Sequence, residues 1–354
     1  MSLHPGILAP LLRVRALNNP EFALGSLGGR YVVLAFLPQP GPEREAALAL
    51  VREHSAQFAD LSRLFFGVLP DADSFAAATD DRTFRWFGDM TGDMRRAFQA
   101  IGPDGELEPQ WIVLDPTLRI LTHAPLAEGR TVLERLATLG RPEDHAGVPM
   151  HAPVLITPRI FDPDLCQRLI EAYDRDGGAP SGVMKQIGGK TVGVLDDFKR
   201  RRDANLTDID LLEAVRQSIS LRLLQQIEKV FQFKPTRIER YIVACYDAGE
   251  GGYFRPHRDN TTTGTAHRRF AVSINLNADG FEGGDLRFPE FGPATYRPPT
   301  GGAVVFSCSL LHEATPVTKG TRYAFLPFLF DEDAERIRQA NRHAVIGAEE
   351  ATAS

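Results

Sequence analysis

The sequence predicts two domains of different classes, an α/β domain followed by a strand-rich domain of the β-sandwich or jelly-roll type. The chain has 354 residues, 43% of them apolar and 24% charged, which is enough for two hydrophobic cores. Between Leu139 and Pro153, two glycines, three prolines and three charges interrupt the apolar periodicity. We therefore expect domains at residues 1–140 and 153–335, a linker at 141–152, and a C-terminal helix and tail at 336–354.

In the first domain, short apolar runs alternate with a helical pattern. The expected strands Tyr31–Leu37 and Leu64–Leu69 flank an expected helix over Glu43–Phe58, and a third strand, Trp111–Leu114, ends at a polar turn. Continuous apolar strands separated by helices are typical of a sheet that is buried on both faces. The first domain is therefore expected to be α/β.

The second domain should open with a strand over Ala152–Thr157 and a helix capped by Asp162, with Pro163 at its first position. A longer helix over Asp208–Phe231 carries apolar residues every three or four positions, which predicts a face directed at the core. The residues of this stripe are Leu211, Leu212, Val215, Ile219, Leu223, Ile227 and Val230.

The rest of the second domain reads as a series of short strands between glycine-rich or proline-rich turns. They are Ile238–Tyr246, Phe270–Leu276, Asp285–Phe288, Ala303–Ser307 and Arg322–Phe330. Strands at such spacing indicate a β-sandwich or jelly roll. Pro327 cannot donate a ladder hydrogen bond, so we expect an edge or a bulge at that point of the last strand.

Two histidines and one carboxylate of this domain are candidate metal ligands. His257 and Asp259 are two residues apart, so in an extended segment they point to the same side. His312 follows 55 residues later, just after the apolar strand GAVVFS. Two imidazoles and one carboxylate leave open positions on a metal, as an oxygen-activating non-haem iron site requires. Taken by themselves, His257 and Asp259 could instead belong to a surface loop with a salt bridge to a neighbouring arginine.

Arg322 and Tyr246 are candidates for binding a dicarboxylate cosubstrate. The guanidinium of Arg322 suits bidentate pairing with a carboxylate, although a structural ion pair with Asp285 or Glu313 is the alternative. Tyr246 offers a phenol to the same carboxylate, or packs simply as a buried aromatic. Both interpretations of each residue stay open from the sequence.

Two polar segments near these candidates have uncertain roles. The basic run Lys199–Arg202 is typical of a solvated loop with ion pairs to neighbouring aspartates, or it contacts an acidic substrate at the mouth of the site. The loop Asn260–Arg268 is polar and contains glycine, so we expect a lid, with His267 at the surface rather than as a fourth ligand.

The composition limits which binding partners and which cellular compartment are expected. A net charge of −6 gives no overall attraction to nucleic acid or to an anionic membrane. No apolar run approaches about 18 residues and the N-terminus lacks a secretory pattern, so a cytoplasmic protein is expected. The three cysteines, Cys166, Cys245 and Cys308, have no CxxC spacing and are expected to be buried and reduced.

Five segments of the second domain resemble the 2-oxoglutarate- and iron(II)-dependent dioxygenases of the prolyl 4-hydroxylase-like group. They are CYDAGEGGYFRPHRDN, RRFAVSINLN, FEGGDLRF, GGAVVFSCSLLHEATPV and GTRYAF. The resemblance implies a double-stranded β-helix in which His257, Asp259 and His312 bind Fe(II) and Arg322 anchors 2-oxoglutarate. It also implies that dioxygen and 2-oxoglutarate are consumed, with L-ascorbate as a supporting reductant, to hydroxylate a C–H bond of a peptidyl or small-molecule substrate and release succinate.

The first domain, through LNNPEFALGSLGGRYVVLAFLP and PQWIVLDPTLRIL, resembles the peroxiredoxin branch of the thioredoxin fold. That family needs a thiolate just after the first long strand. This chain has Pro38, Gln39, Pro40 and Gly41 there, and no cysteine before Cys166, so a thiol peroxidase is excluded. A thioredoxin-like domain for docking, substrate presentation, dimerisation or structural support is expected instead. The whole chain is then either a hydroxylase or a catalytically silent module that binds or senses metal and dicarboxylate.

Overall fold

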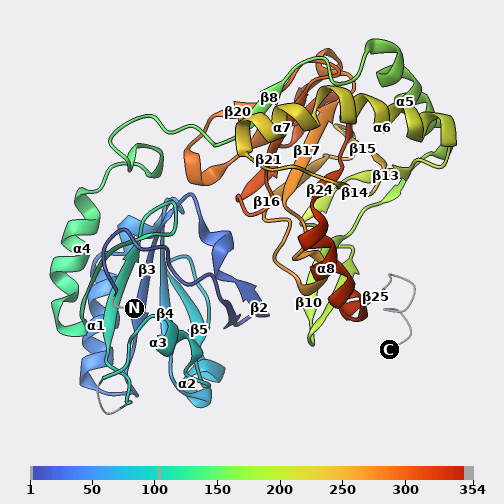
Figure 1. Ribbon diagram of the computed structural model, residues 1–354. Helices are drawn as coiled ribbons and strands as arrows, with labels where there is room; N and C mark the ends of the chain where they lie inside the picture. The colour runs from blue at the N-terminus through green and yellow to red at the C-terminus, as the bar shows by residue number, and fades with distance from the viewer. Residues whose placement is uncertain (1–2, 103–104, 347–354) are drawn as a thin grey trace. The chain divides into compact units, whose positions relative to one another are not determined.

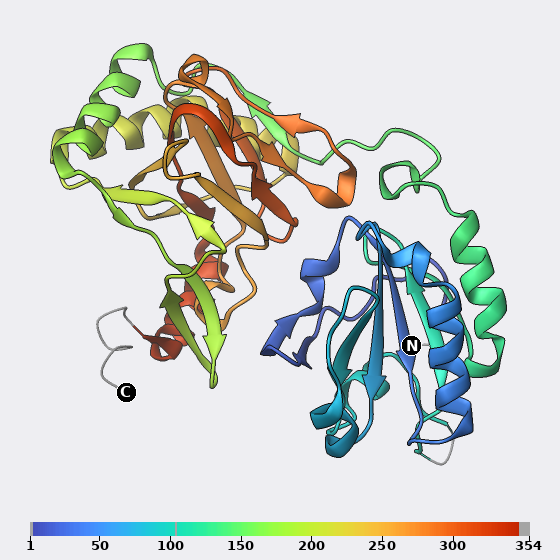
Figure 2. The same cartoon turned by 180° about the vertical axis from the view of Figure 1, so that it is seen from behind.

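The computed structural model of the chain describes residues 3–102 and 105–346, and these form two compact units. The first unit runs to His151 and includes Pro289–Pro293, while the second comprises Ala152–Phe288 and resumes at Ala294. Each unit has its own sheets and helices (Figures 1 and 2). The chain is thus a mixed α/β protein.

The N-terminal unit is built on one seven-stranded sheet in the order β2-β1-β5-β4-β3-β6-β7. Its strands are β1 (Arg13–Ala16), β2 (Asn19–Ala23), β3 (Tyr31–Phe36), β4 (Arg63–Leu69), β5 (Phe84–Gly88), β6 (Gln110–Leu114) and β7 (Ile120–Pro125). The central strands β3, β4 and β5 are parallel, whereas β6 runs antiparallel to both β3 and β7. The helices are α1 (Pro42–Glu53), α2 (Ala72–Ala77), α3 (Asp93–Ala97) and α4 (Gly129–Thr138).

Both faces of this sheet are buried, as the continuous apolar strands predict. Alternate residues of β3 enter opposite cores, because successive side chains of a strand point to opposite faces. Val33 packs with residues of α1 and α4 on one face, and Leu34 packs with residues of α3 on the other. The helix expected over Glu43–Phe58 ends at Glu53, and a 3-10 turn covers Ser55–Phe58.

The second unit contains two main sheets and one small one. The smaller main sheet has the order β12-β16-β22-β19-β20, and the larger follows β14-β24-β17-β23-β15-β13-β9, with β21 and β8 continuing from β17 and β18 beside β23. Strands β10, β11 and β25 form the third sheet. The bounds are β8 (Leu155–Thr157), β9 (Ala179–Pro180), β10 (Val183–Ile187), β11 (Lys190–Val194), β12 (Lys199–Arg200), β13 (Arg202–Asn205), β14 (Arg237–Glu239), β15 (Ile242–Asp247), β16 (Tyr253–His257), β17 (Phe270–Asn275), β18 (Phe281–Gly283), β19 (Leu286–Arg287), β20 (Thr295–Tyr296), β21 (Ala303–Ser307), β22 (His312–Ala314), β23 (Val317–Phe325), β24 (Phe328–Phe330) and β25 (Val345–Ile346).

Three helices cover the larger sheet, as Figure 1 shows. They are α5 (Pro163–Asp176), α6 (Ile209–Arg222) and α7 (Leu224–Phe231), and a fourth helix, α8 (Glu332–Ala340), follows the last strand of that sheet. The side chain of Asp162 accepts a hydrogen bond from the Leu165 amide at 2.9 Å, so α5 begins at the cap expected from the sequence. The helices and the larger sheet share one core that includes Leu169, Ile219 and Val272.

Three elements expected to be continuous are interrupted. The helix expected over Asp208–Phe231 breaks at Leu223, and Val230, expected in the core, is 50% exposed. The strand expected over Ile238–Tyr246 breaks at Arg240, whose backbone is left-handed with φ 56°.

The strand expected over Arg322–Phe330 also breaks, because Pro327 separates β23 from β24. This proline is not at an edge, since β24 pairs with β14 on one side and β17 on the other. The expected bulge is present in the facing strand, because the step from Glu239 to Val243 is four residues and the step between their partners Phe328 and Phe325 is three. The C-terminal helix begins at Glu332, four residues before the position expected from the sequence.

Candidate metal centre

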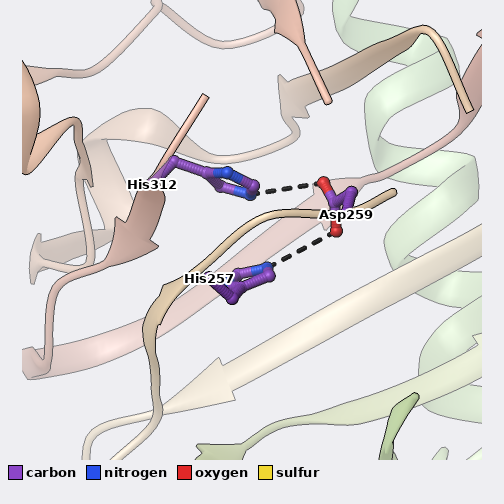
Figure 3. Close-up of side chains that lie close together, drawn as sticks. All are labelled: His257, Asp259 and His312. Carbon is purple, nitrogen blue, oxygen red and sulfur yellow. Dashed lines mark ion pairs between the residues drawn. The ribbon is translucent and has the colours of Figure 1, made fainter. Parts of the chain in front are cut away.

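The three candidate ligands converge from two neighbouring strands of the smaller sheet (Figure 3). His257 ends β16 and His312 begins β22, and the register of this antiparallel pair places the two directly opposite each other. Asp259 lies two residues beyond β16, where its amide donates to the Cys308 carbonyl at 3.0 Å. The Asp259 carboxylate oxygens lie 3.5 Å from Nε2 of His257 and 3.3 Å from Nε2 of His312. The three potential ligand atoms all lie within 4.8 Å of one another.

Backbone carbonyls set the tautomer of both histidines. Nδ1 of His257 lies 2.8 Å from the Arg255 carbonyl oxygen, and Nδ1 of His312 lies 3.0 Å from that of Leu310. A carbonyl oxygen only accepts, so each Nδ1 carries the proton and each Nε2 presents its lone pair. This is the usual outer support of metal-binding histidines.

The electrostatics of the cluster favour the protonation states that bind a metal. Burial and the neighbouring His312 lower the pKa of His257 to about 4, which keeps its imidazole neutral at physiological pH. Burial alone would raise the pKa of Asp259, but the two histidines outweigh it and hold that pKa well below its usual range. Two neutral imidazoles and one carboxylate form the donor set of the facial triad that binds non-haem Fe(II). The residues present therefore fit a ferrous ion.

The triad lines a cavity between the two main sheets. The cavity is lined by Arg201, Arg240, Tyr246, Phe254, His257, Asp259, Ala271, Val272, Ser273, Leu286, Phe306, His312, Ala314, Arg322, Leu326, Pro327 and Phe328. Phe254 stacks on His257 with ring centroids 3.5 Å apart, and Phe306 meets His312 edge-on at 4.6 Å. The cavity is thus lined by aromatic rings and by guanidinium groups.

Arg322 also lines the cavity, with only 2% of the residue exposed. It donates from Nε to the Asn275 side-chain oxygen at 3.2 Å and from Nη2 to the Ser273 hydroxyl at 2.8 Å. Burial lowers the pKa of its guanidinium, because the charged form has lost its water.

Neither carboxylate considered as a structural partner of Arg322 binds it. Asp285 pairs with Arg297, and Glu313 pairs with Arg287. Among the described residues, no carboxylate forms an ion pair with Arg322. A buried cation without an anion is costly, so this arginine is positioned for an anionic ligand.

Tyr246 lies beside Arg322, since the two are directly paired between β15 and β23. The guanidinium carbon of Arg322 is 5.3 Å from the centre of the Tyr246 ring, within cation–π range. The Tyr246 hydroxyl accepts a hydrogen bond from Arg201 at 3.4 Å. Tyr246 therefore packs as a buried aromatic side chain and also lines the cavity.

The basic run Lys199–Arg202 is not a solvated loop, so that expectation is wrong. Its residues form β12 and the start of β13, and Lys199 and Arg201 are each only 7% exposed. Arg201 lines the cavity and pairs with Asp203 at 2.6 Å. Because successive strand residues face opposite sides, alternate members of the run point inward. The acidic partner two residues after Arg201 was a sequence signal for this arrangement.

The loop Asn260–Arg268 does not have the character of a free lid. Thr262 and Thr265 form a reciprocal capping box and are 4% and 2% exposed. His267, expected at the surface, is 3% exposed, and its Nε2 lies 2.7 Å from a carboxylate oxygen of Glu239. Polar side chains can be buried when they are paired, and the sequence does not show that the partner is 28 residues away.

Arg240 also lines the cavity, although no pattern in the sequence singles it out. No motif surrounds it, and its left-handed backbone lies in the two-residue connection between β14 and β15. The expectation for the cysteines is confirmed, since all three are buried and free. Across residues 3–102 and 105–346, no helix is long and apolar enough to cross a membrane.

Comparison with known proteins supports the resemblance found in the sequence. Residues 241–330 match the 2OG-Fe(II) oxygenase superfamily. A PKHD-type hydroxylase from Bordetella pertussis is 36% identical over 113 residues, which cover 29% of this chain and 49% of that protein. The chain spans 42% of the length of PKHD-type hydroxylases from two Synechococcus strains, at 28% identity over 97 residues.

Solved structures with detectable likeness fall into two groups. A prolyl hydroxylase from Trichoplax adhaerens, in complex with a hypoxia inducible factor peptide fragment, covers 58% of this chain and 93% of its own at 18% identity and a TM-score of 0.42. A mitochondrial 2-Cys peroxiredoxin from Plasmodium falciparum covers 38% of this chain and 91% of its own at 19% identity and a TM-score of 0.31.

Proposed function

We propose, from the premise that residues 241–330 match the 2OG-Fe(II) oxygenase superfamily, that this protein is a 2-oxoglutarate- and iron(II)-dependent dioxygenase. It would hydroxylate an unactivated C–H bond of a peptidyl or small-molecule substrate and release succinate and CO2. One observation carries the proposal: a complete facial donor set and a buried arginine without a carboxylate partner line the same cavity.

Different residues of the chain would bind the metal and the cosubstrate. His257 and His312 would hold the iron through Nε2, and Asp259 through its carboxylate. When bound, Fe(II) supplies dioxygen activation coupled to oxidative decarboxylation of 2-oxoglutarate. Arg322 would pair with the cosubstrate's far carboxylate, and Ser273 would fix the orientation of its guanidinium.

Two aromatic rings pack against the histidines and help to hold them in place. Phe254 covers the face of His257, and Phe306 packs against His312. Such packing restricts the imidazoles to the orientation that their backbone hydrogen bonds select, which favours a preorganised site.

The proposal includes a fold for each unit. Two main sheets enclosing the site support a double-stranded β-helix for the second unit. Parallel β3–β5 beside antiparallel β6 and β7, with helices on both faces, support a thioredoxin-like first unit. Because no cysteine precedes Cys166, the role we propose for the first unit is protein docking or dimerisation without thiol chemistry.

The direct test is succinate formation by the purified full-length protein with Fe(II), 2-oxoglutarate and ascorbate. We expect slow turnover without added substrate, and its loss in His257→Ala and Asp259→Ala. Arg336→Gln is the control, because Arg336 is an exposed arginine on α8. Unchanged succinate formation in either ligand variant would contradict the assignment. Metal-dependent binding of 2-oxoglutarate without any succinate would identify the catalytically silent module instead.

A further inference from the structure

The cavity contains more arginines than binding of the cosubstrate would use. Three arginines line it, and each can be sorted by its counter-ion. Arg201 is paired with Asp203, and Arg322 is the proposed partner of 2-oxoglutarate. Arg240 remains, and no carboxylate of the described residues forms an ion pair with it. The nearby Arg268 provides the contrast, because it is held by Glu239 at 2.5 and 3.0 Å.

The side chain of Arg240 is held in place without being neutralised. Its Nε donates to the Leu326 carbonyl oxygen at 3.0 Å, and its guanidinium carbon lies 4.3 Å from the centre of the Phe328 ring. These contacts fix the plane of the guanidinium and leave its two terminal nitrogens without a carboxylate. Burial, together with repulsion from Arg201 and Arg268, lowers the pKa of Arg240 to about 10. An anion beside it would relieve that repulsion.

The backbone at Arg240 is in a conformation that most side chains avoid. Its φ of 56° is left-handed, which is uncommon for residues other than glycine, asparagine and aspartate. Such outliers concentrate at functional sites, where the surrounding structure holds them. Here the left-handed residue directly follows β14, and its side chain lines the cavity.

Arg240 and Arg322 lie toward opposite ends of the cavity. Arg240 precedes Ile242, the first residue of β15, whereas Arg322 is paired with Tyr246 near the end of the same strand. At about 3.3 Å per residue, Ile242 and Tyr246 are roughly 13 Å apart. Arg240 shares the Phe328 ring with Arg268, whose guanidinium carbon lies 4.0 Å from the ring centre. Arg268 in turn donates from Nη1 to the backbone carbonyl of Asp259 at 3.4 Å, so Arg240 lies toward the metal end. A cosubstrate that reaches from the metal to Arg322 leaves Arg240 free for a second anion.

We propose that Arg240 binds a carboxylate of the substrate, so that the enzyme acts on a small organic acid rather than on an internal residue of a neutral peptide. This inference rests on the proposed function. The planar, stacked guanidinium suits a planar carboxylate, and the aliphatic wall formed by Ala271, Leu326 and Pro327 suits a short hydrocarbon chain beside it.

The test measures binding instead of turnover. Full-length protein is loaded with Mn(II) and saturating 2-oxoglutarate, and propionate is compared with propionamide by titration calorimetry at constant ionic strength. The two probes share a shape and differ in charge. We expect propionate to bind at least about tenfold more tightly, a difference of about 1.4 kcal/mol.

The preference should disappear in Arg240→Gln and in Arg240→Asn, and persist in the exposed control Arg336→Gln. Asparagine is included because it tolerates a left-handed backbone. Equal binding of the two probes to the unmodified protein, or a preference that survives both Arg240 variants, would overturn the inference. If the proposed function itself is wrong, the experiment gives another result: 2-oxoglutarate does not bind in the presence of Mn(II).

Discussion

Replacing Arg322 by glutamine tests the cosubstrate site with a magnitude that the structure supplies. The guanidinium is 2% exposed, is oriented by Ser273 and Asn275, and has no carboxylate partner among the described residues. Removing one partner of a buried, hydrogen-bonded charge pair typically costs about 2 to 5 kcal/mol. At about 1.4 kcal/mol per factor of ten, the dissociation constant for 2-oxoglutarate should rise roughly 30- to 4,000-fold.

A thermal-stability assay can measure this rise in the dissociation constant without catalytic turnover. With Mn(II) present and 2-oxoglutarate at 100 times its Kd, the unmodified protein should gain about 2.7 kcal/mol in unfolding free energy. At the same concentration, a variant with a 30-fold higher Kd gains only about 0.9 kcal/mol. Arg336→Gln, which alters an exposed arginine, should show the full gain.

The reasoning would be refuted by an Arg322→Gln variant whose 2-oxoglutarate-dependent stabilisation equals that of the unmodified protein. A variant that loses stability equally with and without 2-oxoglutarate would show only a structural role. Titrating the cosubstrate separates the two outcomes, because a weakened site recovers its stabilisation at higher concentration.

Three further changes test electrostatics and packing elsewhere. Burial alone would raise the pKa of Glu239, but its hydrogen bond with His267 and its ion pair with Arg268 outweigh that effect and hold the pKa well below its usual range. Its stabilising effect is therefore complete above the ordinary value of 4.5 and is lost as the pH falls, and calorimetry of Glu239→Gln should show a loss of about 3 to 5 kcal/mol at neutral pH. Burial and a neighbouring arginine lower the pKa of Lys199 from 10.5 to about 6, so the folded state binds fewer protons than the unfolded state between these values. Unfolding free energy should then rise with pH across that window, and urea titrations of Lys199→Met at several pH values should show a flatter dependence. In the first unit, a methyl group at Gly67 would lie 2.5 Å from the Trp86 ring, so Gly67→Ala should cost about 1 to 3 kcal/mol, measured by tryptophan fluorescence during urea unfolding.

Each of these predictions has an outcome that contradicts it. A Glu239→Gln protein as stable as the original would show that the buried guanidinium of Arg268 needs no anion. An unchanged pH slope in Lys199→Met would assign the dependence to other groups. Both tryptophans, Trp86 and Trp111, lie in the N-terminal unit, so an unaltered fluorescence transition in Gly67→Ala would contradict the tight packing there.

Much of the fold followed from local patterns. The strand Tyr31–Phe36 was visible as a continuous apolar run, and the cap at Asp162 was visible as an aspartate before a proline. These features depend on neighbours within a few residues, so the sequence contains them directly. The breaks at Leu223 and Arg240 were not visible, because they depend on how one element packs against another.

The sequence by itself determined the chemistry of the metal donors: His257, Asp259 and His312 were selected by residue type, spacing and resemblance. Only the tertiary structure decided the charges of the cavity around them. It placed Arg201 and Lys199 inside rather than in solvent, joined His267 to Glu239, and brought Arg240 to the metal end. The physical reason is that the role of a charged side chain can be judged only when its partner is known. These partners come from segments that are distant in the sequence. A buried arginine that is paired with a carboxylate is already neutralised, whereas one without a carboxylate is a candidate for binding an anion, and the amino-acid letter is the same for both.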